Sequence, residues 1–355
     1  MAVCTLVIGA ASMPAGAFNC NQTTTLDRPI ELGVSGGNIN SFGGSGGRRF
    51  CFSGTLGSLV GDMTNTQYIL SNNHVLADVN KAKPGQLIVQ PGLVDTGPVC
   101  TKMQGDAVAT FSRDVKIKFG GAKNMVDAAI AAVIPGDVSA DILNIGGIAG
   151  SPVDTPTVGL GIQKMGRSSC LTMATISAVS MNGKINYGGG KIAKFVNQIV
   201  INSSGFSSAG DSGSLIVTQD ACPQAVGLLF AGSADGSTTV ANPITAVLDG
   251  LKIAMVGSCT PAAALDTATP NVMAGNVGMS KEVVASATAV RDRHEDELMS
   301  IPGAVGTGVG AGDQPGQPAI VVYVKKMTPE AQSAAPKAVE GVPVKLIENG
   351  GFVAY

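Results

Sequence analysis

The chain has 355 residues, of which 45% are apolar and 14% are charged, and its formal net charge is −2. This balance argues against a nucleic-acid surface, and no run of about 18 apolar residues offers a membrane-spanning helix. Abundant glycine (48 residues) and frequent Val, Ile and Thr favour many short strands joined by turns.

Residues 1–17 have the pattern of a secretory signal peptide. The stretch from Ala2 to Ala11 is apolar and small, and Ala15-Gly16-Ala17 supplies an A-x-A pattern before Phe18. The basic start that such signals carry is absent, since the first basic residue is Arg28. An ordinary buried strand is the alternative interpretation.

Cysteine usage also indicates export. Without residues 1–17 the chain keeps an even number of cysteines, which suits disulfides in an oxidising compartment: Cys20, Cys51, Cys100, Cys170, Cys222 and Cys259. We therefore expect a secreted or periplasmic protein. No Cys-x-x-Cys pair occurs and the two histidines are far apart, so we expect no metal and no cofactor.

The middle of the chain reads as a β domain. Residues 18–48 are polar and glycine-rich and predict a flexible N-terminal segment, with loop over 33–47. Residues 49–257 alternate short apolar runs with turn residues, which is typical of a barrel or sandwich. The runs are 68–70, 128–134, 198–201 and 214–217. A helix over 241–255 closes this region.

A Pro/Ala/Thr-rich linker, 258–280, leads to a small C-terminal unit, 281–355, which we call the C-terminal module. Apolar residues recur at helical spacing over 283–301, followed by strands over 303–312 and 319–324. Thr328 and Pro329 open a short helix, and alternation from Val342 predicts a last strand. The module is thus expected to be α+β.

Ser212 is the candidate nucleophile. It lies in Gly210-Asp211-Ser212-Gly213-Ser214, where small neighbours admit a carbonyl and leave backbone N–H groups for an oxyanion. A serine hydroxyl needs a base, and the chain offers His74, after an apolar strand, and His294, in a charged helix.

Asp127 is the candidate acid that orients the base. It opens the run 128–134, and a carboxylate at the head of a buried strand is costly unless it is paired. A carboxylate fixes the tautomer of a catalytic histidine. On chemistry alone, Asp78, Asp106 and Asp114 stay open as alternatives.

The segments around His74, Asp127 and Ser212, in this order, resemble the trypsin/chymotrypsin-like serine proteases, and most closely the bacterial secreted branch with streptogrisin-like and α-lytic-like enzymes. The resemblance covers about residues 49–255 and departs at Ser214, where the family usually has glycine. It implies a mainly β, double β-barrel chymotrypsin-like protease fold, here with the C-terminal α+β module added.

The resemblance also implies further site residues. The N–H groups of Gly210 and Ser212 would bind the oxyanion, and Arg167 would pair with Asp211. The walls of the specificity pocket would come from Phe206, Phe230, Ala231, Gly232 and Thr239. Because no acid stands at the expected pocket base, we expect a small or medium apolar residue before the cut.

The function that follows is a serine endopeptidase that cleaves protein or peptide substrates through an acyl-enzyme. The alternatives are a catalytically inactive protease-like binding or scaffold protein, and an esterase with the same triad. The C-terminal module is expected to inhibit intramolecularly, to aid folding or to bind a partner.

Overall fold

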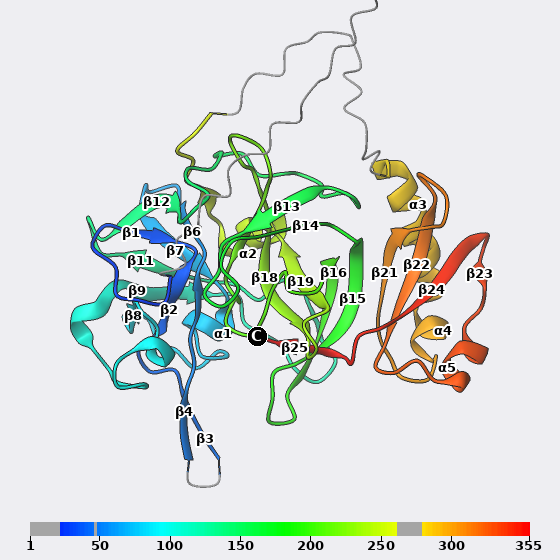
Figure 1. Cartoon of the computed structure of the whole chain (residues 1–355), viewed down its shortest axis with the longest axis horizontal. Coiled ribbons are helices and arrows are strands. Elements are labelled where there is room, and N and C mark those ends of the chain that lie inside the picture. The colour runs from blue at the N-terminus through cyan, green and yellow to red at the C-terminus, as the bar shows by residue number, and fades with distance from the viewer. Residues whose placement is uncertain (1–21, 46–47, 261–278) are drawn as a thin grey trace, which may run out of the picture.

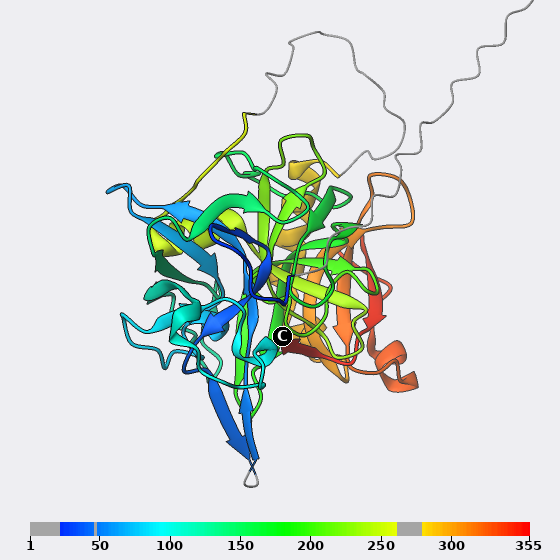
Figure 2. The ribbon, with the colours of Figure 1, turned by 60° about the vertical axis from the view of Figure 1, so that its left-hand side comes forward.

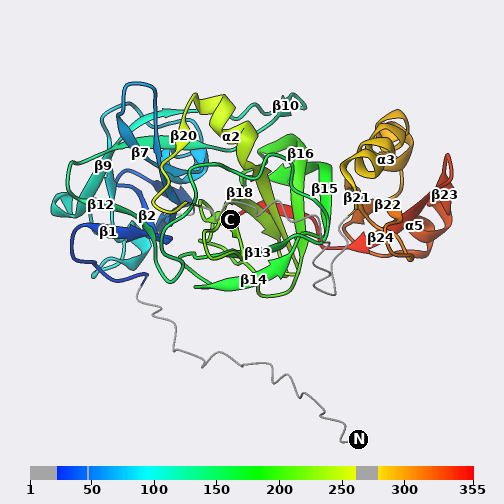
Figure 3. The ribbon, with the colours of Figure 1, turned by 90° about the horizontal axis from the view of Figure 1, so that it is seen from above.

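The computed structural model describes residues 22–45, 48–260 and 279–355. Two β-lobes and the C-terminal module lie in a row, as Figure 3 shows. The expected double β-barrel with a small α+β module is confirmed. The predicted signal peptide, 1–17, and most of the predicted linker lie outside the described residues.

The first lobe is an eight-stranded sheet in the order β20-β6-β7-β11-β9-β8-β2-β5. Its core is apolar and includes Leu70 and Ile130, which face each other on adjacent antiparallel strands. The bounds are β2 Val34–Asn38, β5 Gly54–Leu56, β6 Ser58–Gly61, β7 Gln67–Ser71, β8 Leu87–Val89, β9 Ala107–Asp114, β11 Ala129–Val133 and β20 Ala254–Met255. The short helix α1, Asn73–Leu76, follows β7 directly.

The N-terminal segment is not the flexible loop that its composition predicted. Strand β1, Ile30–Leu32, pairs with β12, Val138–Ile142, and β2 lies buried between β5 and β8. A Cβ at Gly36 would lie 2.4 Å from Leu56 Cγ, so glycine here permits close packing of strands. The strands β3, Phe42–Ser45, and β4, Arg48–Cys51, form a hairpin that projects from the lobe (Figure 2).

The second lobe and the module share one thirteen-stranded sheet. The strands of the lobe run in the order β14-β13-β17-β18-β19-β16-β15, and the sheet continues through β21, β22, β24 and β23. The bounds are β10 Lys123–Asn124, β13 Gly161–Lys164, β14 Thr172–Thr175, β15 Ala178–Asn186, β16 Ile192–Asn202, β17 Leu215–Thr218, β18 Ala225–Ser233, β19 Thr238–Pro243, β21 Ala304–Ala311, β22 Pro318–Val324, β23 Ala338–Val339, β24 Val342–Glu348 and β25 Phe352–Ala354. The predicted closing helix is α2, Ile244–Leu251.

The helices of the module are α3 Lys281–Arg293, α4 Glu295–Met299 and α5 Pro329–Ala334. The hydroxyls of Ser280 and Thr328 cap α3 and α5. The single helix predicted over 283–301 is broken at His294, whose φ and ψ are −109° and 11°. At this break the ring of His294 bonds to the side chains of Glu297 and Glu340.

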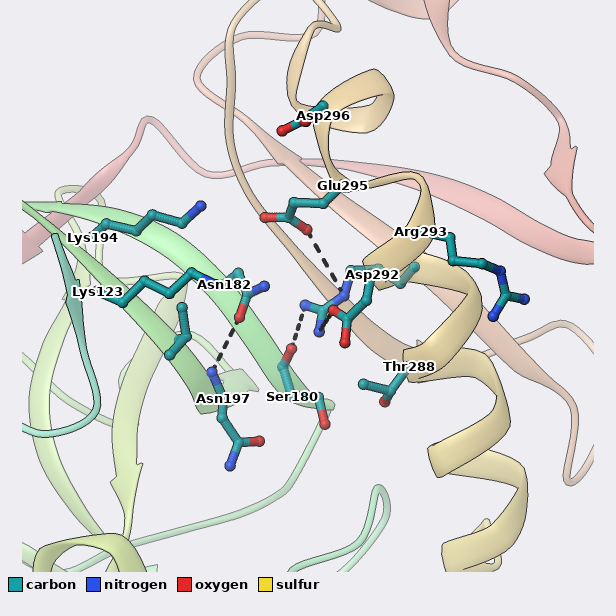
Figure 4. A pocket seen from close by; sticks show the side chains of 12 residues that line it. Lys123, Ser180, Asn182, Lys194, Asn197, Thr288, Asp292, Arg293, Glu295 and Asp296 are labelled. Carbon is teal, nitrogen blue, oxygen red and sulfur yellow. Dashed lines mark hydrogen bonds and ion pairs between the residues drawn. The ribbon is translucent and has the colours of Figure 1, made fainter. Parts of the chain in front are cut away.

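The module is bonded to the second lobe along β15. Strand β21 pairs antiparallel with β15, with Asn182 opposite Thr307. The buried guanidinium of Arg291 donates to the Ser180 carbonyl at 2.5 Å and lies 3.8 Å from Glu295. Figure 4 shows Ser180 on the lobe and Glu295 on the module, on either side of this contact. The module therefore covers an edge of the second lobe that would otherwise present unpaired backbone groups.

Two disulfides are formed within the described residues, Cys51–Cys100 and Cys222–Cys259, and Cys170 is also disulfide-bonded. They fit the oxidising compartment that the cysteine count indicated. None of the described helices has the length and apolar character that crossing a bilayer requires.

Candidate active site

His74 and Asp127 are directly bonded at the junction of the two lobes. His74 lies in α1 at the end of β7, and Asp127 lies just before β11, the strand that pairs with β7. The Nδ1 atom of His74 is 2.6 Å from Asp127 Oδ2, and the carboxylate also accepts the His74 N–H at 3.2 Å. Asp114, left open by the sequence, bonds instead to Asn73 and Lys116.

Buried amides fix the backbone of Asp127. Asn72 Nδ2 donates to the Asp127 carbonyl at 2.7 Å, and the Asp127 N–H donates to Asn242 Oδ1 at 2.6 Å. Gln198 in turn accepts from Asn242 Nδ2 at 2.8 Å. The carboxylate is fully buried, so this network sets its direction toward His74.

Tyr187 is a partner of Asp127 that the sequence analysis missed. It follows β15, and its hydroxyl donates to Asp127 Oδ2 at 2.7 Å. Its ring stands edge-on to that of His74, with centroids 6.0 Å apart. Burial, and then the Asp127 charge, raise the pKa of Tyr187 well above its ordinary value, so the phenol stays a neutral donor.

The imidazole of His74 is held between two oxygen acceptors. Its Nε2 atom is 2.8 Å from the backbone oxygen of Tyr355, on the side opposite Asp127. Burial lowers the pKa of His74, but the Asp127 charge and the hydrogen bonds to Asp127 and Tyr355 outweigh burial and raise the pKa overall.

Ser212 lies on a turn that is pinned to the first lobe. The Thr55 N–H donates to the Ser212 carbonyl at 2.7 Å, and a Cβ at Gly213 would lie 2.1 Å from the Thr55 carbonyl oxygen. Gly213 also has a φ of +96°, so glycine is required there. The Ser212 hydroxyl donates to the Phe230 carbonyl at 3.0 Å, and in the described part of the chain it has no hydrogen bond to His74.

The N–H groups of Gly210 and Ser212, the predicted oxyanion donors, have no hydrogen-bond partner among the described residues. The Gly210 carbonyl accepts from Thr55 Oγ1 at 3.0 Å, which fixes that peptide. The hydroxyl of Ser214, at the position where the motif departs from the family, is buried, and no described residue bonds to it.

The predicted ion pair between Arg167 and Asp211 is wrong. Arg167 binds Asp95 through Nε at 2.6 Å and Nη2 at 2.7 Å. Asp211 instead lies 3.5 Å from the buried ammonium of Lys164. Its carboxylate also accepts the N–H groups of Ser168, Ser169 and Ser208 and the Ser169 hydroxyl.

Lys164 therefore supplies the charge that we expected from Arg167. The guanidinium of Arg167 instead pairs with Asp95, a residue that the sequence did not point to. Both carboxylate oxygens of Asp95 accept from the guanidinium in a partly exposed site. Burial lowers the pKa of Lys164, and the Asp211 charge opposes that shift. Lys164 ends strand β13, and nothing in the neighbouring sequence predicts that its side chain is buried.

The predicted pocket residues lie on β18, β19 and the turn before Ser212. The Ser207 hydroxyl bonds to Thr239 Oγ1 at 2.5 Å, and Phe206 is buried next to Ser207. The ring of Phe230 packs against the ring of Phe195, so Phe230 contributes only its backbone to the predicted pocket. Gly232 lies against the side chain of Tyr355, because a Cβ there would be 2.1 Å from Tyr355 Oη.

Comparisons with known proteins match the chain to solved structures at low identity. No protein-family model and no curated protein matches the chain. Among solved structures, it is similar to the Nocardiopsis protease NAPase, at 15% identity and a TM-score of 0.43, over 64% of this chain and 98% of that one. It is also similar to Thermobifida fusca protease A, at 15% identity and a TM-score of 0.41, over 62% and 98%.

A third similar structure is Cellulomonas bogoriensis chymotrypsin, at 18% identity and a TM-score of 0.40, over 62% of this chain and 98% of that one. These three structures, to which the chain is similar at low identity, are bacterial serine proteases.

Proposed function

We propose that the chain is a serine endopeptidase, with Ser212 as nucleophile, His74 as general base and Asp127 as the acid that orients the base. The observation that carries the proposal is the arrangement around Tyr355. Its backbone oxygen contacts His74 Nε2, and its N–H donates to the Phe230 carbonyl that also accepts the Ser212 hydroxyl. His74 and Ser212 therefore flank the backbone of a single residue.

In the proposed reaction, Tyr355 leaves first. Rotation of the Ser212 side chain about its Cα–Cβ bond redirects the hydroxyl from Phe230 to the vacated Nε2. The oxygen attacks a peptide carbonyl while its proton passes to His74 Nε2. His74 then gives this proton to the leaving amine as the C–N bond breaks, and water resolves the acyl-enzyme by the same route.

The other residues stabilise the charges that develop. Asp127 stabilises the imidazolium through its 2.6 Å bond to Nδ1. The N–H groups of Gly210 and Ser212, which no described residue binds, would bind the tetrahedral oxyanion. Asp211 and its partner Lys164 keep the turn that carries these donors in place, because the carboxylate accepts the backbone N–H groups of both Ser168 and Ser208.

Substitution tests the proposal. We expect Ser212→Ala and His74→Ala each to lower peptide turnover by a factor on the order of 10⁴ to 10⁶. The background should be Tyr355→Ala, which removes the side chain of the residue between His74 and Ser212. The place that residues 352–355 occupy, beside His74 and strand β18, is called the cleft below. Retention of turnover in either variant would overturn the assignment.

A protease-like binding or scaffold protein is the second candidate. The observation that favours it is the Ser212 hydroxyl, which donates to Phe230 and not to His74. Such a protein would bind peptides in the cleft without acylation. Reaction of Ser212 with an organofluorophosphonate separates the two functions, because only an activated serine is labelled.

A further inference from the structure

The end of the C-terminal module enters the cleft as an added strand. Strand β25, Phe352–Ala354, lies between β15 and β18 and pairs with both. Its pairing with β18 is antiparallel, with Ala354 opposite Ala231 and Val353 opposite Gly232. The Tyr355 N–H continues the ladder to the Phe230 carbonyl at 3.3 Å. Figure 1 shows this end of the chain between the two lobes.

Tyr355 also reaches the candidate base. Its backbone oxygen is 2.8 Å from His74 Nε2, while residues 352–354 extend away along β18. In a bound substrate, the residues on the amino side of the bond to be cut would lie extended along the same strand, and the backbone oxygen of the last of them would lie near the base. Residues 352–355 occupy this place. Residues 352–355, which we call the C-terminal segment, thus imitate a bound substrate.

The side chain of Tyr355 lies where a pocket is expected. Its hydroxyl donates to the Ser233 carbonyl at 3.0 Å, and the ring crosses Gly232, where a Cβ would be 2.1 Å from Oη. The ring packs against the apolar cluster that contains Phe206 and Leu229. A tyrosine side chain at this place therefore packs against apolar residues, meets no side chain at Gly232 and has an acceptor for its hydroxyl.

We propose that the C-terminal segment is an intramolecular ligand that inhibits the cleft, and that its pocket selects an aromatic residue, tyrosine above all, before the cut. This inference rests on the proposed peptidase function and deepens it. It replaces the small or medium apolar residue that we expected from the sequence, because Gly232 leaves room for a ring. The module then acts as a built-in competitor of substrate.

The first experiment compares the unaltered chain with Tyr355→Ala and Tyr355→Phe. The substrate is an acylated Phe-Val-Ala-Tyr p-nitroanilide, and the matched control substrate ends in Ala instead of Tyr. We expect Tyr355→Ala to raise turnover of the tyrosine substrate at least tenfold, Tyr355→Phe to raise it less, and the alanine substrate to be cut poorly. Equal turnover by all three chains, or preference for the alanine substrate, would overturn the proposal.

The second experiment measures binding and needs no catalysis. A chain ending at Gly351, with Ser212→Ala, is titrated with the free peptides Phe-Val-Ala-Tyr and Phe-Val-Ala-Ala by calorimetry. We expect the tyrosine peptide to bind at least tenfold more tightly, and circular dichroism checks that the shortened chain is folded. Should the shortened chain lose its fold, the same titration is run on the Ser212→Ala, Tyr355→Ala chain.

The two experiments separate the two proposals. Selective peptide binding without turnover by any variant would support the ligand assignment and contradict the peptidase function. Turnover that is unchanged by Tyr355→Ala, together with no selective binding, would contradict the ligand assignment and leave the peptidase function in place.

Discussion

At the scale of single residues, the two nitrogens of His74 determine how the site responds to pH. Nδ1 faces Asp127 Oδ2 and Nε2 faces the Tyr355 backbone oxygen, and both of these atoms are acceptors. A ring that donates on both sides is an imidazolium. The C-terminal segment therefore binds the protonated form of His74, whereas catalysis needs the neutral form of His74.

The ratio of kcat/KM in Tyr355→Ala to kcat/KM in the unaltered chain should therefore rise as pH falls. The pKa of His74 is raised from 6.5, so stabilisation by the docked segment is fully present below pH 6.5 and is lost as pH rises through the raised pKa. The phenol of Tyr187, whose ring contacts that of His74, and the phenol of Tyr355, which bonds to Ser233, both have raised pKa values, so they stay neutral. Asp127 is the counter-ion of His74. Rate profiles from pH 5 to 8 measure the ratio, and a flat or falling ratio contradicts this account.

Tyr187 acts through Asp127 as a positioning residue. In Tyr187→Phe the carboxylate loses one donor, and its charge is then felt more strongly by His74. We expect kcat to fall about tenfold, or about 1.4 kcal/mol, and the acid limb of the pH profile to move to higher pH. Tyr68→Phe is the matched control, since its hydroxyl binds Asp62 away from the site. An unmoved profile in Tyr187→Phe would refute this role.

Lys164 should matter more for stability than Arg167. Lys164→Met would leave Asp211 buried without its counter-ion and lower the free energy of unfolding by about 3–5 kcal/mol. Arg167→Gln breaks a partly exposed pair and should cost less. Urea unfolding of both variants measures the difference, and a larger loss in Arg167→Gln would reverse our assignment.

Some of these residues could be predicted from the sequence, and others could not. His74, Asp127 and Ser212 stand in local segments that can be read from the chain. Lys164 and Tyr187 take their roles from burial and from partners at distant positions, Asp211 and Asp127. No local pattern predicts such a partnership. For this reason the sequence predicted Arg167, and not Lys164, as the partner of Asp211.

At the scale of elements, β25 is the strand on which inhibition depends. It lies between two strands, so proline at 353 removes an N–H from a pairing strand and disrupts the ladder. We expect Val353→Pro to release Tyr355 and to raise turnover of the tyrosine substrate as Tyr355→Ala does. Val353→Ala, which keeps the N–H, should behave like the unaltered chain. The idea fails if the two variants have equal turnover.

Strands were predictable where an apolar run carries its own signal. The runs 68–70 and 214–217 correspond to β7 and β17. Strand β25 was missed because it has three residues and owes its conformation to β15 and β18. Strand β2 was missed because glycine, which reads locally as loop, is there required by close packing against Leu56.

At the scale of the whole molecule, the module both completes a sheet and supplies a ligand. Removal of residues 281–355 would uncover β15, which now pairs with β21. An exposed strand edge favours self-association, so we expect the shortened chain to form aggregates or dimers, as measured by light scattering. Tyr355→Ala should stay in the same state as the unaltered chain. A monomeric truncated chain with an unchanged unfolding midpoint would contradict the covering role.

The most direct test of the catalytic proposal is reaction of Ser212 with an organofluorophosphonate, with the adduct located by mass spectrometry. We predict an adduct on Ser212 in Tyr355→Ala, slower labelling in the unaltered chain and none in His74→Ala. Absence of an adduct in Tyr355→Ala, or equal labelling in His74→Ala, would show that this hydroxyl is not activated by the imidazole.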